Sequence, residues 1–414
     1  MHELNVLAAI QFALSWQVLA AAGVSLLSTL LLTPFARWCA HKTGVVDRPD
    51  GARKLQRKPV ALLGGVAVLA GLGVTIFAAA AAGAMDNSLE SIVLVSVGLS
   101  MLCAVGVVDD AYNLRAGWKL LAQVGAAIPI VVAGCAIDKI SIFGLQMSFG
   151  SLGVVAALGW LIACTNAVNL IDGIDGLCST VGLCVAAGAT AIAYLSGADN
   201  TVVCAAALAG SLAGFLVYNF PPASIYLGDA GSMVVGMTLA LLTLRVAQYE
   251  NGVTNPLVMA ALMGIPLGDA TLAVIRRKLS GKPIFQADRG HIHHRLLEHG
   301  LNVTQSLAVI AAISISTGAV SVGVYYARSD LFGVMSLLFI VAVLVNRRLV
   351  GHYEWLLVRA ILTRRADQSE PASTEGTATI LRFDAEPSLG LHSHIPQDAS
   401  TAQGEFVEKR RRAA

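Results

Sequence analysis

The chain has 414 residues, of which 56% are hydrophobic and only 13% are charged, and its mean hydropathy is +0.70. Soluble proteins carry about 25% charged residues, so this composition excludes a soluble enzyme and an intrinsically disordered protein. The formal net charge of +2 also excludes a nucleic-acid-binding protein that relies on a large positive charge. The composition therefore predicts an integral membrane protein.

Apolar stretches of membrane-spanning length recur along the first 346 residues. A helix needs about 20 apolar residues to cross the hydrocarbon core of a bilayer. Eleven stretches come close to this length: 14–36, 60–83, 90–108, 119–137, 151–169, 177–196, 201–219, 231–249, 256–275, 304–326 and 330–346. The sequence thus predicts an all-α polytopic integral membrane protein, with residues 1–346 forming a membrane domain of about eleven transmembrane helices.

Lys and Arg residues are distributed unevenly between these stretches. If the N-terminus lies outside, the inner connections up to residue 300 carry fifteen Lys and Arg residues, and the outer connections carry three. The outer three are Lys139, Arg245 and Arg328. Because cytoplasmic loops are enriched in Lys and Arg, we expect the N-terminus outside and the C-terminus in the cytoplasm.

The sequence changes character after residue 346. Residues 347–365 mix aromatic and aliphatic side chains with several arginines, which suits a juxtamembrane helix lying on the inner leaflet. Residues 366–414 are rich in Ser, Thr, Ala and Glu and end in a basic run, which predicts a disordered cytoplasmic tail. The basic end could touch anionic lipid, but we favour a solvated tail.

Ionisable side chains gather in the connections that this orientation assigns to the cytoplasm. They are Asp109, Asp110, Asp172, Asp175, Asp229, Asp288, His291, His293 and His294. The second to eighth stretches carry none near their middle, and Asp269 lies near the inner end of the ninth. A secondary transporter or lipid flippase would place such residues at the midplane, and a non-catalytic scaffold needs no such cluster. The pattern instead predicts a catalytic site at the inner membrane surface.

Asp109 and Asp110 close the third apolar stretch, and Lys119 opens the fourth. Two adjacent carboxylates repel each other unless a cation or a proton relieves them; the alternative is a pair of boundary charges. Lys119 suits either a topology anchor or a phosphate ligand that acts as a point charge. These three residues are the catalytic candidates.

A polar stripe begins at the end of the fifth stretch and continues beyond it. Asn166, Asn169, Asp172 and Asp175 recur every three residues, so on a helix they would share one face. Two glycines in the same stretch would let backbone approach a ligand closely. The twelve-residue pattern of a calcium-binding EF-hand is absent. We interpret the four residues as substrate-binding candidates.

Asp229 stands between glycines at the start of the eighth stretch, in the segment Gly228–Ser232. A carboxylate with open backbone around it suits magnesium, which takes one or two protein carboxylates together with substrate phosphates. The alternative is a helix cap. Asp229 is the metal-ligand candidate.

His291, His293, His294 and Arg295 lie in the longest inner connection. Three histidines without another fixed ligand are a weak zinc signal, whereas His and Arg together suit a polyanion such as pyrophosphate. A solvated basic loop is the alternative. These four residues complete the substrate-binding candidates.

Five ordered motifs between about residues 40 and 300 resemble those of the polyprenyl-phosphate N-acetylhexosamine-1-phosphate transferases. They are Asp47-Arg48-Pro49 with Arg53-Lys54 and Gly64-Gly65, then Asp109-Asp110, then Asn166 to Leu177, then Gly228 to Ser232, then His291-Ile292-His293-His294. The last motif is more similar to the branch that uses UDP-N-acetylglucosamine than to the UDP-MurNAc-pentapeptide branch, which carries a triple-His run.

The resemblance implies a reaction in which undecaprenyl phosphate attacks the β-phosphate of a UDP-sugar, giving a lipid-linked sugar pyrophosphate and UMP. It implies UDP-N-acetylglucosamine as the donor, Mg²⁺ as the cofactor with Mn²⁺ as an option, and the bacterial cytoplasmic membrane as the location. Membrane lipid is an expected partner, and a homodimer is one option for assembly. Another UDP-N-acetylhexosamine or UDP-MurNAc-pentapeptide stays open as the donor, as does the glycan that the product starts.

The resemblance also implies roles, position by position. Asp229 resembles the magnesium ligand, and Asp109 and Asp110 resemble the pair that handles the lipid phosphate. The polar stripe resembles the nucleotide-sugar contacts, and the histidines resemble pyrophosphate or sugar contacts. One departure is Gln56, which stands where the family often has a histidine, and we expect its replacement to matter little.

Overall fold

The computed structural model describes residues 16–49, 58–85, 88–249, 252–283, 288, 290–351, 354, 355, 358 and 359. All of them belong to the first of two compact units, Met1–Thr363; the second is Arg364–Ala414. The predicted tail and the motif residues Arg53, Lys54 and Gln56 lie outside the described residues.

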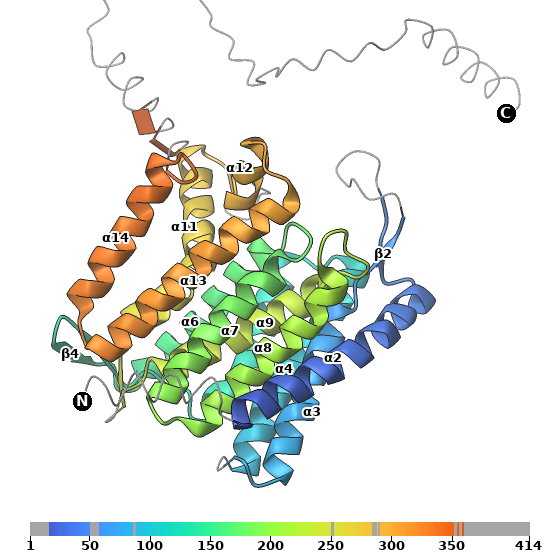
Figure 1. Cartoon of the computed structure of the whole chain (residues 1–414), viewed down its shortest axis with the longest axis horizontal. Coiled ribbons are helices and arrows are strands. Elements are labelled where there is room, and N and C mark those ends of the chain that lie inside the picture. The colour runs from blue at the N-terminus through green and yellow to red at the C-terminus, as the bar shows by residue number, and fades with distance from the viewer. Residues whose placement is uncertain are drawn as a thin grey trace, which may run out of the picture. The chain divides into compact units, whose positions relative to one another are not determined.

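Thirteen helices form the described part of the chain (Figure 1). They are α2 (Trp16–Thr43), α3 (Gly64–Ala81), α4 (Leu89–Tyr112), α5 (Ala116–Val132), α6 (Leu152–Ile171), α7 (Leu177–Leu195), α8 (Asp199–Asn219), α9 (Gly228–Val246), α10 (Pro256–Leu262), α11 (Gly264–Leu279), α12 (Ile292–Glu298), α13 (Val303–Ala327) and α14 (Asp330–Asn346).

Eight of these helices are long and apolar enough to cross a membrane, or nine if the bent pair α10–α11 counts as one span. This confirms a polytopic helical membrane protein. Every one of the eleven apolar stretches contains a helix, but α5 and α14 have only 17 residues each, short of the roughly 20 that a bilayer needs. By helix length, the described residues therefore give eight or nine spans, and the expected count of about eleven stays a prediction.

The ninth apolar stretch, expected as one helix over 256–275, is broken. α10 and α11 meet at Met263 with a bend of 85°. Pro266 explains the break, because proline has no backbone N–H and its ring clashes with the carbonyl four residues earlier, here that of Leu262. Asn255 caps the start of α10 by accepting hydrogen bonds from the backbone nitrogens of Leu257 and Val258.

α9 lies at the centre of the helices and is buried along most of its length. It contacts α3, α4, α6 and α7. Glycine allows the closest of these approaches: a Cβ on Gly65 of α3 would lie 2.2 Å from the Cα of Gly231. Backbones that approach this closely are typical of helix packing in membranes, and here they fix the start of α9 against α3.

Two small sheets were not predicted from the sequence. β1 (Val46–Asp47) pairs antiparallel with β2 (Val60–Ala61). In the second sheet, β3 (Lys139–Ile142) lies between β4 (Leu145–Ser148), which is antiparallel to it, and β5 (Val253–Thr254), which is parallel. Strands of two to four residues leave no clear period in a sequence, so the all-α expectation overlooked them.

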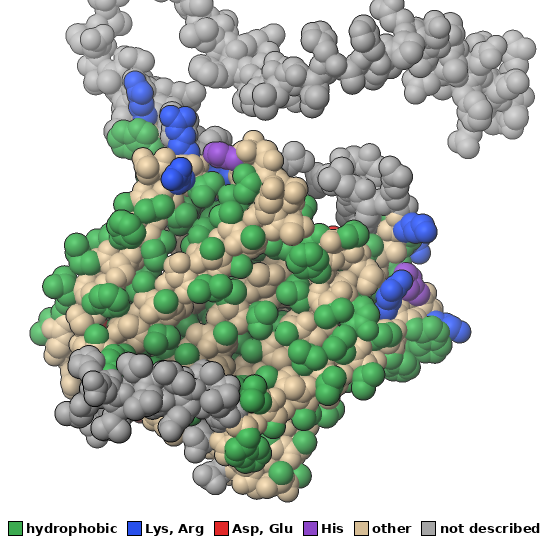
Figure 2. All heavy atoms as spheres, in the orientation of Figure 1, with side chains coloured by type: hydrophobic (Ala, Val, Ile, Leu, Met, Phe, Trp, Pro, Cys, Tyr) green, Lys and Arg blue, Asp and Glu red, His purple; other side chains and the backbone are tan. Residues whose placement is uncertain are grey.

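The surface has the character expected of a membrane protein. In Figure 2, hydrophobic side chains cover much of the visible face along the helices, and the Lys and Arg side chains in view lie near the parts where α2 and α14 end. Large side chains such as Leu31, Phe339 and Leu27 are more than half exposed. An apolar exterior of this extent fits a lipid solvent.

Candidate active site

Five of the predicted site residues meet at one end of the bundle, where α4 and α6 end and α5 and α9 begin. We call this the site end. The acidic cluster consists of Asp109, Asp110, Lys119, Asn169 and Asp229, which come from four helices and are linked by hydrogen bonds and ion pairs. The sequence motifs are far apart in the chain, so only packing around α9 brings them together.

Asp110 caps the helix that carries Asp229. Its carboxylate oxygens accept hydrogen bonds from the backbone nitrogens of Asp229 (2.8 Å) and Ala230 (3.2 Å). The first backbone nitrogens of a helix lack intrahelical partners, and a carboxylate there is favoured by the helix dipole. Asp110 therefore orients the first turn of α9.

Lys119 joins two carboxylates. Its Nζ donates to Oδ2 of Asp229 at 2.8 Å and forms an ion pair with Oδ2 of Asp109. Asp109 is buried, and its other oxygen accepts a hydrogen bond from the backbone nitrogen of Leu114 at 2.7 Å. A buried carboxylate needs such partners, so Lys119 holds Asp109 and Asp229 together.

The first half of the polar stripe faces the acidic cluster. Nδ2 of Asn169 donates to Oδ1 of Asp229 (3.0 Å) and to Oγ of Ser232 (2.8 Å). Asn166, about one turn earlier on α6, donates instead to Oε1 of Gln123 at 2.7 Å. Asn169 thus positions the carboxylate of Asp229, whereas Asn166 joins α6 to α5.

A pocket of about 670 Å³ opens beside the acidic cluster. Asp109, Asp110 and Asp229 line one part of it, and the segment that includes Asp47 and Arg48 lines another. Pockets for small ligands have volumes of about 300–1,000 Å³, so this one can hold a phosphate-bearing group. Asp47 and Arg48 of the first motif therefore line the same pocket as the acidic cluster.

Asp172 and Asp175 follow α6 in the loop that leads to α7. Burial, and the nearby carboxylates of Asp229, Asp110 and Asp175, raise the pKa of Asp172 to about 7. Asp175 accepts a hydrogen bond from the backbone nitrogen of Ala223 at 2.8 Å. Asp172 therefore adds to the negative charge of Asp110 and Asp229, whereas Asp175 holds its loop against the backbone of Ala223.

The three histidines form a second group, the histidine cluster, which consists of His291, His293 and His294. The rings of His291 and His293 are stacked, with centroids 5.7 Å apart, and those of His293 and His294 are 4.2 Å apart. Asp269 of α11 organises the group: its carboxylate lies 2.7 Å from Nδ1 of His291 and accepts a hydrogen bond from the backbone nitrogen of Ile292.

His293 lies against the loop that follows α6 and carries Asp172. A Cβ on Gly173 would lie 2.7 Å from its Nε2, so only glycine leaves room for the ring beside the loop that carries Asp172. The ring is 1% exposed and neither nitrogen has a hydrogen-bond partner among the described residues. Burial, with a contribution from His294, lowers the pKa of His293 to about 3, so the imidazole is neutral.

Arg295 serves the scaffold of the histidine cluster. It is buried and donates to the carbonyl of Gly290 (3.1 Å) and to Glu354 (3.0 Å). Arg276 also donates to Glu354 (2.8 Å) and to Asp288. This buried ion network ties residues on α11, on α12 and after α14 to the loop that presents His291.

Burial alone would raise the pKa values of Asp288 and Glu354, but hydrogen bonds from Arg276 hold both below their usual range. Both acids are therefore ionised at neutral pH.

Several residues of the site were missed in the sequence. Asp269 had a usable signal, because a carboxylate inside an apolar stretch is costly unless it has a function. Gln123 also had one, since it lies four residues after Lys119 and so shares its helix face. Ser232 and Glu354 had none: their roles depend on contacts with segments distant in the chain.

The residues present fit the magnesium ion that the motifs imply. Magnesium uses few protein carboxylates and completes its shell with phosphate oxygens and water. Asp229 offers a carboxylate that is one-third exposed at the pocket. Burial, and next the neighbouring carboxylates, raise the pKa of Asp172, and a cation among these carboxylates would offset their mutual repulsion. Among the residues described, no group of three or more His, Cys, Asp or Glu forms a closed metal site.

Known proteins share this pattern. Residues 92–247 match the model of glycosyl transferase family 4. The chain is 34% identical over 303 residues to a Bacillus subtilis protein named "Probable undecaprenyl-phosphate N-acetylglucosaminyl 1-phosphate transferase". The aligned residues cover 72% of this chain and 82% of the Bacillus protein.

Two further relatives carry related names. The undecaprenyl-phosphate alpha-N-acetylglucosaminyl 1-phosphate transferase of Escherichia coli K12 is 28% identical over 77% of this chain and 87% of its own length. The decaprenyl-phosphate N-acetylglucosaminephosphotransferase of Mycobacterium tuberculosis H37Rv is 30% identical over 66% of this chain and 75% of its own length. With these matches, the multi-pass membrane architecture and the acidic cluster around α9, the chain belongs to glycosyl transferase family 4, the family of polyprenyl-phosphate sugar-1-phosphate transferases that its motifs resemble.

Proposed function

We propose that this protein transfers N-acetylglucosamine-1-phosphate from UDP-N-acetylglucosamine to undecaprenyl phosphate in the bacterial cytoplasmic membrane, releasing UMP. The product would start a lipid-linked cell-envelope glycan. The observation that carries the proposal is the acidic cluster beside a pocket of about 670 Å³ at the end of membrane-spanning helices. There a lipid phosphate at headgroup level and a soluble nucleotide-sugar can meet.

In the proposed reaction an oxygen of the lipid phosphate forms a bond with the β-phosphorus of the UDP-sugar. The bond from that phosphorus to the oxygen bridging the α-phosphate breaks, and UMP leaves with the electron pair. Phosphoryl transfer of this kind depends on positioning and on neutralising charge. Mg²⁺ bound at Asp229 would neutralise the phosphate oxygens and favour departure of UMP.

The contacts of the chain support distinct roles. Lys119 is a cation that already bridges two carboxylates beside the pocket, so it can share its charge with a phosphate oxygen. Asn169 orients Asp229. Both oxygens of Asp110 accept hydrogen bonds from backbone N–H groups, and those of Asp109 contact Lys119 and the backbone nitrogen of Leu114. The proposal therefore assigns the remaining proton of the lipid phosphate to this pair of carboxylates and not to one of its members.

The histidine cluster suits the sugar-pyrophosphate end of the donor. His293 is neutral and unpaired among the described residues and lies against Gly173, so it can accept or donate a hydrogen bond without bringing charge. The relatives named above carry N-acetylglucosamine in their names, which favours this sugar over another UDP-N-acetylhexosamine or UDP-MurNAc-pentapeptide.

The test is UMP release by the full chain, purified in detergent, with undecaprenyl phosphate, Mg²⁺ and a panel of UDP-sugars. We expect UMP only when lipid, metal and UDP-N-acetylglucosamine are all present. Release of UMP with a different UDP-sugar would support the proposed reaction but would change the proposed donor. Folded protein that releases no UMP with any donor would contradict the proposal and favour a transport function.

A further inference from the structure

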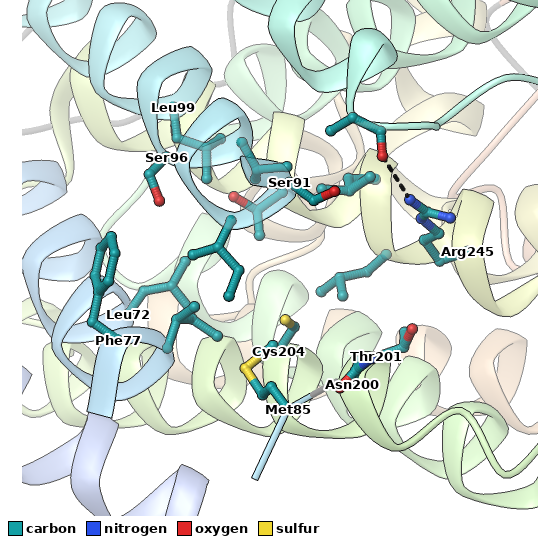
Figure 3. A pocket seen from close by; sticks show the side chains of 18 of the residues that line it. Leu72, Phe77, Met85, Ser91, Ser96, Leu99, Asn200, Thr201, Cys204 and Arg245 are labelled. Carbon is teal, nitrogen blue, oxygen red and sulfur yellow. Dashed lines mark hydrogen bonds between the residues drawn. The ribbon is translucent and has the colours of Figure 1, made fainter. Parts of the chain in front are cut away.

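A second cavity runs along the bundle from Val66, near the start of α3, to Arg245, at the end of α9 that lies away from the acidic cluster. Its volume is about 690 Å³, and its walls come from α3, α4, α8 and α9 together with the segments after α5 and before α8 (Figure 3). The lining includes Arg245 in the last turn of α9. At 1.5 Å per residue, Arg245 is about 24 Å along the helix from Asp229. The charged end of this cavity is therefore far from the acidic cluster.

The cavity is amphipathic. Figure 3 shows Leu72 and Phe77 toward one side and Arg245, Asn200 and Thr201 toward the other. Arg245 is the only charged residue among the described residues that line the cavity. An occupant that fits this wall has a long apolar part and one negatively charged group.

Arg245 lacks a negative partner among the residues that the structure describes. A guanidinium group carries five N–H donors. Those of Arg245 make a long hydrogen bond, 3.4 Å from Nη2 to the carbonyl of Ala133, and a hydrogen bond with the thiol of Cys135, and both partners are uncharged groups. The dipole of α9 favours a cation in the last turn but does not satisfy those donors. A phosphate oxygen would, because Arg pairs with phosphate through two parallel hydrogen bonds.

We propose that this cavity binds an anionic phospholipid, with its phosphate at Arg245 and one acyl chain against Leu72 and Phe77. The lipid is distinct from the substrate lipid, whose phosphate must reach the acidic cluster at the other end of α9. A volume of about 690 Å³ is in the range of sites that enclose a small ligand.

The bound lipid also supports the catalytic site. α3, α4 and α9 line the cavity, and the same three helices carry Gly65, Asp110 and Asp229 at the site end. An acyl chain between them holds their spacing along the cavity wall that the three helices share. Turnover therefore rises when anionic phospholipid is supplied.

Native mass spectrometry of the purified full chain tests the proposal, with phosphatidylglycerol and phosphatidylcholine of the same acyl chains as probes. We expect the wild type to bind phosphatidylglycerol about tenfold more tightly, because both lipids carry a phosphate but only phosphatidylcholine brings a choline cation, which Arg245 would repel. Arg245→Gln should bind the two lipids alike, and Arg245→Lys should keep part of the preference. Equal binding of both lipids to the wild type would overturn the proposal.

Gly73→Leu provides a second variant that leaves Arg245 in place. Gly73 lines the cavity, and a Cβ there meets no atom within 4 Å, so a leucine fills the space without a clash. It should abolish phosphatidylglycerol binding and the stimulation of UMP release by this lipid. Unchanged binding would contradict the assigned cavity, as would displacement of phosphatidylglycerol by undecaprenyl phosphate.

Two matched controls separate the cavity from its surroundings. Gly23 on α2 is equally open but does not line the cavity, so Gly23→Leu should bind phosphatidylglycerol like the wild type. Lys139 is an exposed cation on β3 that is absent from the lining, so Lys139→Gln should do the same. Loss of phosphatidylglycerol binding in both controls would show that the lipid is attracted to the protein surface in general, and it would overturn the proposed site.

Discussion

Asp110 holds the start of the helix that presents Asp229: its carboxylate oxygens accept hydrogen bonds from the backbone nitrogens of Asp229 and Ala230. Two acidic residues of the motifs thus have different structural positions. The side chain of Asp229 points to Lys119 and Asn169 beside the pocket, whereas that of Asp110 is occupied by backbone. The difference leads to different expected effects of substitution.

Asp229→Asn should reduce turnover by at least about a hundredfold, because a neutral amide binds a divalent cation weakly and loses the attraction to Lys119. Its thermal stability should stay close to that of the wild type, since Asn169 and Lys119 keep other partners. The measurement is the rate of UMP release against Mg²⁺ concentration. Near-normal turnover at saturating Mg²⁺ would remove Asp229 from the metal-binding role.

Asp110→Ala should instead lower the stability of the fold. Loss of a side chain that caps a helix costs about 0.5–2 kcal/mol. Here it leaves the backbone N–H groups of Asp229 and Ala230 without their carboxylate partner. The midpoint of thermal unfolding in detergent checks this, with Asp110→Asn as the matched variant that can still accept one hydrogen bond. Equal stability of Asp110→Ala and the wild type would contradict the capping role.

Gly228→Ala should damage both stability and activity. Gly228 has φ +73°, and a Cβ there would lie 2.4 Å from the carbonyl oxygen of Leu62 and 2.5 Å from Oδ2 of Asp110. Gly281 is the matched control, with φ +66° and open space around its Cβ. Gly281→Ala should cost only the backbone term of about 1–2 kcal/mol, and unfolding midpoints of the two variants should differ accordingly. Similar midpoints would show that Leu62 and Asp110 can move aside to accommodate the added Cβ.

His293 should make stability depend on pH. Its pKa is about 3 in the fold, against 6.5 for the ordinary group, so between these values only the unfolded chain binds the proton. Stability is therefore complete above pH 6.5 and falls as the pH falls, by about 1.4 kcal/mol at pH 5.5. Unfolding midpoints at pH 7.5 and 5.5 test this. His293→Gln should show a smaller decrease, and an equal decrease would assign the pH dependence to other groups.

Glu354→Ala should weaken the loop of the histidine cluster. Arg276 and Arg295 are both buried and share Glu354, and removal of one partner from a buried ion pair costs about 3–5 kcal/mol. We expect a lower unfolding midpoint and a higher KM for the UDP-sugar. Trp355→Ala is the control, because Trp355 is 61% exposed. A wild-type KM in Glu354→Ala would show that the loop keeps its position without the network.

Much of the fold could be predicted from the sequence because membrane-spanning helices leave a strong signal. In the bilayer core each backbone polar group must be satisfied within its own segment, so the apolar stretches alone located the helices. The broken span was missed although Pro266 was visible. The small strands were missed because pairs such as Val46 with Ala61 depend on partners elsewhere in the chain.

The chain by itself determined which residues are candidates for the chemistry: Asp109, Asn169, Asp229 and His293 were selected by type, spacing and their shared location between apolar stretches. Only the tertiary structure decided what each one touches. Residues such as Lys119 and Asp229, 110 positions apart, meet because close packing around α9 brings four helix ends together. The pairing of Glu354 with two arginines and the cavity at Arg245 have the same origin, since side-chain contacts across helices are set by packing in three dimensions rather than by local pattern.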